Sequence, residues 1–209
     1  MYMLSQLALS DKIIVIVFLL FSLAFHEAMH AYAAHKLGDN TAADEGRLTL
    51  NPIKHVDLYT TILLPSILIL VGLPPILAAK PVPFDPRQVK YGEYGAALVA
   101  LAGPFTNLGL AVLAAIAVRL GLVGDGMAAH VTGLFMLLNV SLFVFNMIPI
   151  PPLDGSRLLY AFAPEPLQKI MEQIESVGFF LILGILLVLS PFIGPFLSNI
   201  TYAILDFLV

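Results

Sequence analysis

Five long apolar stretches separated by polar loops dominate the hydrophobic pattern of the chain. The first is apolar over residues 13–25 and runs on to about His35. The other four contain no Lys, Arg, Asp or Glu and cover residues 58–79, 95–118, 131–153 and 176–205. A charge in the middle of a bilayer costs free energy, so these runs predict transmembrane or re-entrant segments.

The last apolar run is longer than one crossing needs, and two proline pairs interrupt it. Ser190-Pro191 and Gly194-Pro195 fall within residues 176–205, and proline removes helical hydrogen bonds. This pattern predicts two C-terminal helices over about 176–208, after a core at about 13–160. The sequence therefore predicts one all-α polytopic membrane domain over residues 1–209, with about five to six transmembrane or re-entrant segments.

Composition supports the membrane assignment and excludes several other classes. Hydrophobic residues make up 59% of the chain and charged residues only 11%, whereas soluble domains average about 25% charged residues. The net charge of -4 is scattered, which argues against a nucleic-acid surface. Because the chain has no Cys, disulfides and thiolate metal sites are excluded.

The strongest chemical motif is His26-Glu27-Ala28-Met29-His30 at the end of the first apolar run. Histidines at i and i+4 of a helix lie on one face and can bind one ion, with Glu27 placed beside them to activate a water. Imidazole and carboxylate ligands suit Zn²⁺, although another divalent ion fits the same pattern. The alternative is that both histidines only form hydrogen bonds with neighbouring helices.

A third metal ligand has to come from elsewhere in the chain, and Asp154 is the candidate. It follows the uncharged run 131–153 directly, so it lies at the end of a predicted spanning segment. The sequence Pro152-Leu153-Asp154-Gly155 is also typical of a turn, in which the Asp side chain forms a hydrogen bond with nearby backbone. Spacing alone leaves both interpretations open.

Three segments in this order resemble the site-2 protease family of intramembrane zinc metalloproteases. They are the HEAMH helix, the AGPFTN sequence at 102–107, and residues 146–155. The resemblance implies a three-helix catalytic core in which His26, His30 and Asp154 hold one Zn²⁺ per chain. It implies that Glu27 is the general base and that Asn146 lies near the bound substrate.

The AGPFTN match also makes Asn107 a candidate for substrate binding. Asn107 and Asn139 both lie within apolar runs, where an Asn often forms interhelical hydrogen bonds. Both roles stay open for the two residues, and the AGPFTN match adds some weight to a chemical role for Asn107.

The number of membrane crossings between the HEAMH motif and Asp154 predicts the topology. If each apolar run crossed the membrane once, the HEAMH end of the first helix and Asp154 would lie on opposite faces. The conflict disappears if residues 58–83, which contain five prolines, enter the membrane and return on the same side. Extended edges at 46–50 and 80–84 would then form a small β element near the active site, where an unwound substrate could bind.

The positive charges agree with this re-entrant topology. It leaves only Lys12 and Arg119 on one side of the membrane. The other side carries Lys36, Arg47, Lys54, Lys80, Arg87, Lys90, Arg157 and Lys169. By the positive-inside rule, the N-terminus is outside and the active site opens toward the cytoplasm. We expect an integral protein of the plasma membrane of a prokaryote.

The predicted function is a zinc endopeptidase that cleaves peptide bonds within or next to transmembrane segments. Its substrate is a membrane protein or peptide in the lipid bilayer, attacked by a zinc-bound water with the help of Glu27. One alternative is a metal-ion transporter, against which Glu27 argues because transit does not require it. A catalytically inactive membrane scaffold of the same fold is the other. The sequence favours no oligomeric state.

Overall fold

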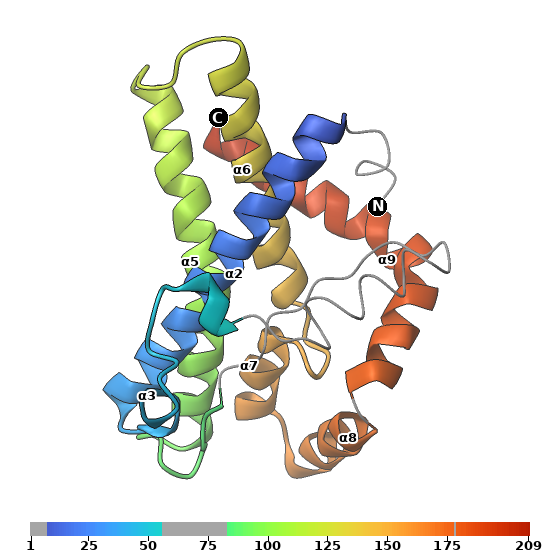
Figure 1. Ribbon diagram of the computed structural model, residues 1–209. Coiled ribbons are helices and arrows are strands. Elements are labelled where there is room, and N and C mark those ends of the chain that lie inside the picture. Colours follow the sequence, from blue (N-terminus) through green and yellow to red (C-terminus); the bar gives the residue numbers. More distant parts are fainter. Residues whose placement is uncertain (1–7, 56–82, 178) are drawn as a thin grey trace.

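The computed structural model describes residues 8–55, 83–177 and 179–209, and the regular elements in these ranges are all helices (Figure 1). The helices before the first gap are α2 (Leu9–Leu37), α3 (Thr41–Asp44) and the short 3₁₀ helix η1 (Pro52–His55). After the gap come α5 (Glu93–Arg119), α6 (Met127–Asn146), α7 (Asp154–Phe162), α8 (Glu165–Ser176) and α9 (Phe179–Leu208). The prediction of an all-helical protein is confirmed for these ranges.

Four of the described helices are long and apolar enough to cross a membrane. They are α2, α5, α6 and the part of α9 at Val188–Leu208. Three correspond to predicted runs, and α2 extends the first run as far as Leu37. The predicted re-entrant run at 58–79 lies outside the described residues.

The run at 131–153 does not form a single helix, which corrects one prediction. Helix α6 ends at Asn146, the chain then forms turns, and α7 begins at Asp154. The physical reason is the group of Pro149, Pro151 and Pro152, which have no backbone N–H for a helix. Asp154 therefore lies in the first turn of a short helix and not at the end of a spanning one.

The C-terminal run forms one continuous helix, so the prediction of two helices is wrong. Helix α9 extends from Phe179 to Leu208 with Pro191 and Pro195 inside it. The ribbon bends along its length (Figure 1). Each proline removes one hydrogen bond and bends the helix, but in an apolar environment the remaining backbone groups are best satisfied within the helix.

The predicted β element does not appear in the described part of the chain. Residues 46–50 form a tight loop in which Thr49 N donates to Arg47 O at 2.9 Å. The buried Arg47 side chain donates to Lys54 O at 2.6 Å and folds this loop onto η1. In the other predicted edge, 80–82 lies outside the described residues, and Pro83 and Phe84 are not in a strand.

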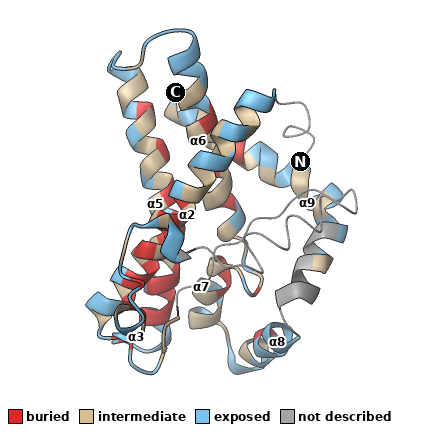
Figure 2. Cartoon of the chain, in the orientation of Figure 1, coloured by how far each residue is buried: buried red, intermediate tan, exposed pale blue. Residues whose placement is uncertain are grey.

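The core lies where α2 and α5 pack against each other. Helix α2 also contacts α6, and α5 also contacts α6 and α7. Most buried residues gather on the halves of α2 and α5 nearest to α7 (Figure 2). Many of them are small, including Ala24, Ala28 and Ala31 on α2 and Ala96 and Ala100 on α5. Small residues let membrane helices approach closely, so polar side chains on these two helices can meet.

The two ends of the helix bundle are each held by polar contacts. At one end, His130 at the start of α6 pairs with Asp11 at the start of α2 at 3.0 Å. Arg119, the last residue of α5, lies at the same end. Its Nε donates to Leu208 O of α9 at 2.7 Å. This end therefore carries Arg119 together with the start of α2.

The opposite end joins the C-terminus of α2 to the approach to α5. Lys90 N donates to Leu37 O at 2.8 Å, and Asp85 N donates to the buried Asp39 Oδ2 at 2.7 Å. Arg87, hydrogen-bonded to the Asp85 carboxylate, holds the pKa of that group well below its ordinary range. The chain thus leaves α2 and enters α5 at the same end of the bundle, as the predicted topology requires.

Candidate metal centre

The two histidines of the HEAMH motif lie one turn apart on α2, and both are buried. His26 Nε2 and His30 Nε2 are 3.0 Å apart. Asp154 Oδ2 lies 3.1 Å from His26 Nε2 and 3.5 Å from His30 Nε2. Residues far apart in the sequence thus bring two imidazoles and one carboxylate to a single point.

Asp154 reaches this point because the turn before α7 closes tightly. A Cβ on Gly155 would lie 2.5 Å from the carbonyl carbon of Met147 and 2.9 Å from Ile148 O. Only glycine lets the start of α7 pack this closely against the chain that leaves α6. The packing of α7 against α5 holds the carboxylate against the histidines of α2.

Each histidine has a partner on α5 for its other ring nitrogen. His30 Nδ1 lies 2.8 Å from Val99 O, and His26 Nδ1 lies 2.7 Å from Asn107 Oδ1. Both partner atoms are acceptors, so both Nδ1 atoms carry the proton. Each Nε2 then keeps a lone pair, and the two lone pairs point toward each other and toward a carboxylate. Three acceptors in contact repel one another unless a proton or a metal ion lies between them, so the cluster could hold a metal ion.

The separations of the three atoms fit a zinc ion. With bonds of about 2.0–2.1 Å, a tetrahedral zinc site has ligand atoms about 3.3 Å apart, and the observed separations are 3.0, 3.1 and 3.5 Å. Gly103 on α5 faces the same point, where a Cβ would lie 2.6 Å from His26 Nε2 and even closer to His30 Nε2. The missing side chain leaves the space that such an ion needs.

The other predicted site residues lie on α2, α5 and α6. Glu27 is half-buried on the same turn of α2 as the histidines. Asn107 is completely buried and contacts His26. Asn146 is the last residue of α6, and its Nδ2 donates to Leu142 O at 3.0 Å within that helix.

Sequence reasoning missed two contributors to the site. Val99 acts through its backbone carbonyl, which no side-chain pattern can reveal. In the sequence, Gly103 stands out only as part of the AGPFTN match. A glycine beside Pro104 in an apolar helix was the available signal, because the pair marks a turn of α5 that another element approaches closely.

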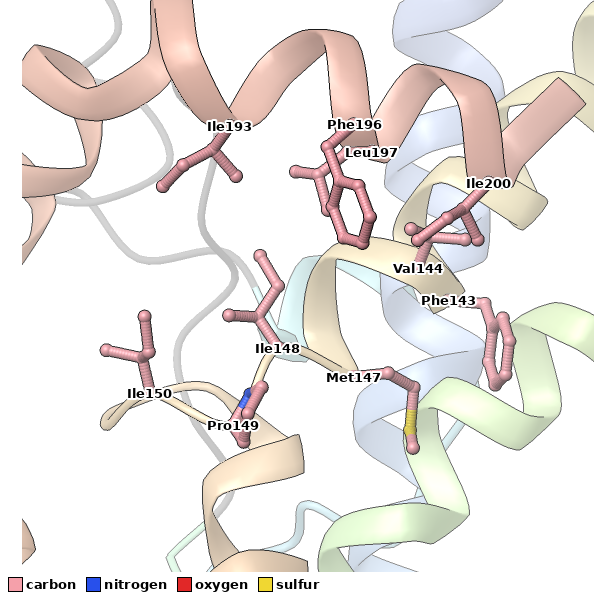
Figure 3. Close-up of a pocket in the computed structure, with 10 residues that line it drawn as sticks. All are labelled: Phe143, Val144, Met147, Ile148, Pro149, Ile150, Ile193, Phe196, Leu197 and Ile200. Atoms are coloured by element: carbon pink, nitrogen blue, oxygen red, sulfur yellow. The ribbon is translucent and has the colours of Figure 1, made fainter.

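A separate apolar cavity lies on the other side of the turn that leads to Asp154. It has a volume of about 320 Å³ and is lined by the end of α6, residues 147–150 and α9. Figure 3 shows the side chains from these three segments facing one another. All ten lining residues are apolar, so this cavity is chemically distinct from the histidine and carboxylate cluster.

An HExxH helix and a distant carboxylate, converging among apolar helices, define the class of membrane zinc metalloproteins. Comparison with known proteins is more specific. The family model for peptidase family M50 matches residues 122–189. No solved structure gives a significant match.

Similar proteins carry matching names. One is the Bacillus subtilis protein named "Putative zinc metalloprotease YwhC", 39% identical over 91% of this chain and 85% of the relative. Others are proteins named "Putative zinc metalloprotease Rip2". The one from Mycolicibacterium smegmatis is 30% identical over 93% of this chain and 74% of the relative. The one from Mycobacterium tuberculosis (strain Erdman) is 31% identical over 90% of this chain and 71% of the relative. The chain belongs to peptidase family M50, the site-2 protease family of membrane zinc metalloproteases.

Proposed function

We propose that the protein is an intramembrane endopeptidase that hydrolyses peptide bonds within or next to transmembrane segments of its substrates. The observation that carries the proposal is the convergence of His26, His30 and Asp154, whose Nε2 and Oδ2 atoms lie within 3.5 Å of one another. In the proposal these three residues hold the Zn²⁺ ion of the family.

The depth of this cluster supports cleavage inside the membrane. At 1.5 Å per residue, His26 lies about 16 Å along the α2 axis from Leu37, and His30 lies about 10 Å from it. The hydrocarbon core of a bilayer is about 30 Å thick. A site at this depth, among helices that are apolar along their length, meets peptide bonds that soluble proteases do not reach.

The proposed chemistry divides the work between the ion and the side chains. When bound, the zinc ion supplies a Lewis acid for the scissile carbonyl and lowers the pKa of the attacking water. Glu27 takes the proton of this water and passes it to the leaving amine. Asn107 and Val99 hold the two imidazoles in place. Asn146, at the end of α6, is proposed to contact the substrate.

The proposed orientation follows the helix ends. Lys12 and Arg119 belong to the end of the bundle that the Asp11–His130 and Arg119–Leu208 contacts define. Most other basic residues of the described chain belong to the end where α2 meets the approach to α5. We therefore propose that the N-terminus is outside, that the site opens toward the cytoplasm, and that the membrane is the plasma membrane of a prokaryote.

The test compares the purified full chain with Glu27→Gln, His26→Ala and Glu45→Gln, using a panel of transmembrane peptides. Loss of a general base lowers the rate by about 10²–10⁴-fold, so Glu27→Gln should keep zinc and lose cleavage. His26→Ala should lose zinc. Glu45 is exposed at the end of α3, so its variant should behave as wild type and controls for loss of a carboxylate.

Three outcomes would contradict this proposal in whole or in part. Equal cleavage by the wild type and Glu27→Gln would exclude Glu27 as the base. Movement of zinc into liposomes by both proteins, without cleavage of any peptide, would favour a transporter. Absence of both activities, with zinc bound, would favour a scaffold.

A further inference from the structure

A chain of buried amide groups connects α6 to His26. Asn139 Nδ2 on α6 donates to Phe135 O at 2.9 Å, and Asn107 Nδ2 on α5 donates to Asn139 Oδ1 at 3.0 Å. Asn107 Oδ1 then lies 2.7 Å from His26 Nδ1. Both asparagines are completely buried. Three helices are thus connected in one row of hydrogen bonds that ends at the metal centre.

The direction of this row is determined at its far end. A backbone carbonyl such as Phe135 O can only accept, so Asn139 must direct its NH₂ group toward it. Its Oδ1 then faces Asn107, which must in turn present its own NH₂ group. Asn107 Oδ1 is left to face His26, so His26 Nδ1 is the donor.

A second backbone carbonyl also favours this orientation of the Asn107 amide, but at a longer distance. Ser22 O lies 3.4 Å from Asn107 Nδ2, compared with 3.0 Å for Asn139 Oδ1. The Asn139 contact is therefore the stronger constraint on the amide of Asn107.

The direction matters because it decides which nitrogen of His26 is free. If Asn107 turned its amide around, an NH₂ group would face His26 Nδ1, and that nitrogen would have to be the acceptor. The ring proton would then sit on Nε2, the atom that faces His30 and Asp154. A proton on that atom prevents it from binding a metal, because the ligand must offer a lone pair.

We propose that Asn139 is a positioning residue that fixes the amide of Asn107 and thereby the metal-binding tautomer of His26. This proposal rests on the proposed ligand set. It gives Asn107 a defined role in orienting a ligand and assigns Asn139, on a different helix, a role in zinc affinity without any contact to the ion.

A double-mutant cycle separates this role from simple packing. The variants are Asn139→Leu, Asn107→Asp and the two combined, and zinc affinity is measured with a competing chelator on the full chain in detergent. Loss of an outer partner of a ligand typically weakens metal binding about 10–100-fold, and we expect this for Asn139→Leu. Both carboxylate oxygens of an Asp at position 107 can accept from His26 Nδ1, so its orientation no longer matters. Adding Asn139→Leu to the Asn107→Asp variant should therefore weaken zinc binding less than threefold.

Three further variants serve as controls for the cycle. Asn139→Asp still accepts from Asn107 Nδ2 and should retain affinity, while Asn139→Ala replaces the leucine variant if that protein does not fold. Val140→Ala removes buried packing from the same helix without touching the amide row. It should lower stability and leave zinc affinity unchanged.

The tautomer can also be observed directly. In zinc-free protein labelled with ¹⁵N-histidine, NMR should show that Asn139→Leu moves the His26 proton from Nδ1 toward Nε2. His30 is the internal control, because Val99 O holds its Nδ1 proton independently of the asparagines.

The outcomes distinguish this proposal from the proposed site. If His26→Ala binds zinc as tightly as wild type, the ligand set is wrong. If His26→Ala loses zinc but Asn139→Leu binds normally, the ligand set stands and the positioning role is wrong. The positioning role would also be overturned if Asn139→Leu lowered zinc affinity as much in the Asn107→Asp background as in the wild type. That result would mean that Asn139 acts only through packing.

Discussion

Replacing Gly103 by alanine is a direct test of how tightly α5 closes over the metal centre. A Cβ at this position would lie 2.6 Å from both His26 Nε2 and His30 Cε1, and closer to His30 Nε2. These neighbours are ring atoms of the two histidines, whose other nitrogens are held by Asn107 and Val99. Neither ring can turn aside without giving up its hydrogen bond.

The size of the effect follows from the distances. Ordinary contact of a Cβ begins near 3.4 Å, so a neighbour at 2.6 Å has to move by about 0.8 Å, whereas metal–ligand distances tolerate only about 0.2 Å. We expect Gly103→Ala to weaken zinc binding by about 100-fold, which corresponds to about 2.8 kcal/mol at 1.4 kcal/mol per tenfold. Peptide cleavage should fall at least as far, because a misplacement of about 1 Å can cost 10²-fold in rate.

Gly109→Ala is the matched control on the same helix. A Cβ at Gly109 meets nothing within 4 Å, so this variant should bind zinc and cleave peptides as the wild type does. Zinc affinity is measured with a competing chelator and cleavage with a quenched transmembrane peptide, and circular dichroism checks that all three proteins are helical. Wild-type zinc affinity in a folded Gly103→Ala protein would refute the close approach of α5 to the histidines.

Two further substitutions test the elements that surround the site. Gly155→Ala should displace the start of α7 from Met147 O and lower zinc affinity, because Asp154 begins that helix; an unchanged affinity would contradict the close turn. Asp39→Ala removes the acceptor for the backbone N–H groups of Thr41 and Asp85, each worth about 1–3 kcal/mol when left unpaired. The free energy of unfolding should fall by several kcal/mol, and by less in Asp39→Asn, which keeps an acceptor oxygen.

The parts of the site that the sequence predicts best are those that depend on local geometry. His26 and His30 are separated by one helical turn, so any helix places them on one face. Asp154 is different, because it reaches them only through the path of the chain after α6. The sequence identified it as a candidate, but its turn chemistry left the role open.

The two errors at 131–153 and 176–205 have one common cause, the context of proline. The same residue type ends α6 before Pro149 and yet lies inside α9 at Pro191 and Pro195. Three prolines within four residues remove too many donors for a helix, whereas single prolines one turn apart leave most of the backbone bonds intact. Hydropathy alone does not distinguish these cases, since both runs are equally free of charges.

The buried histidines and asparagines of α2, α5 and α6 are connected by hydrogen bonds. The carbonyls of Val99 and Phe135 can only accept, and this fixes the proton positions on His30 and, through Asn139 and Asn107, on His26. The result is two lone pairs and a carboxylate within 3.5 Å of one another. Such a cluster of acceptors is unfavourable in an apolar bundle unless a cation joins it. In the proposed site, the hydrogen bonds that orient the two histidines and a bound zinc ion would therefore stabilise the same arrangement.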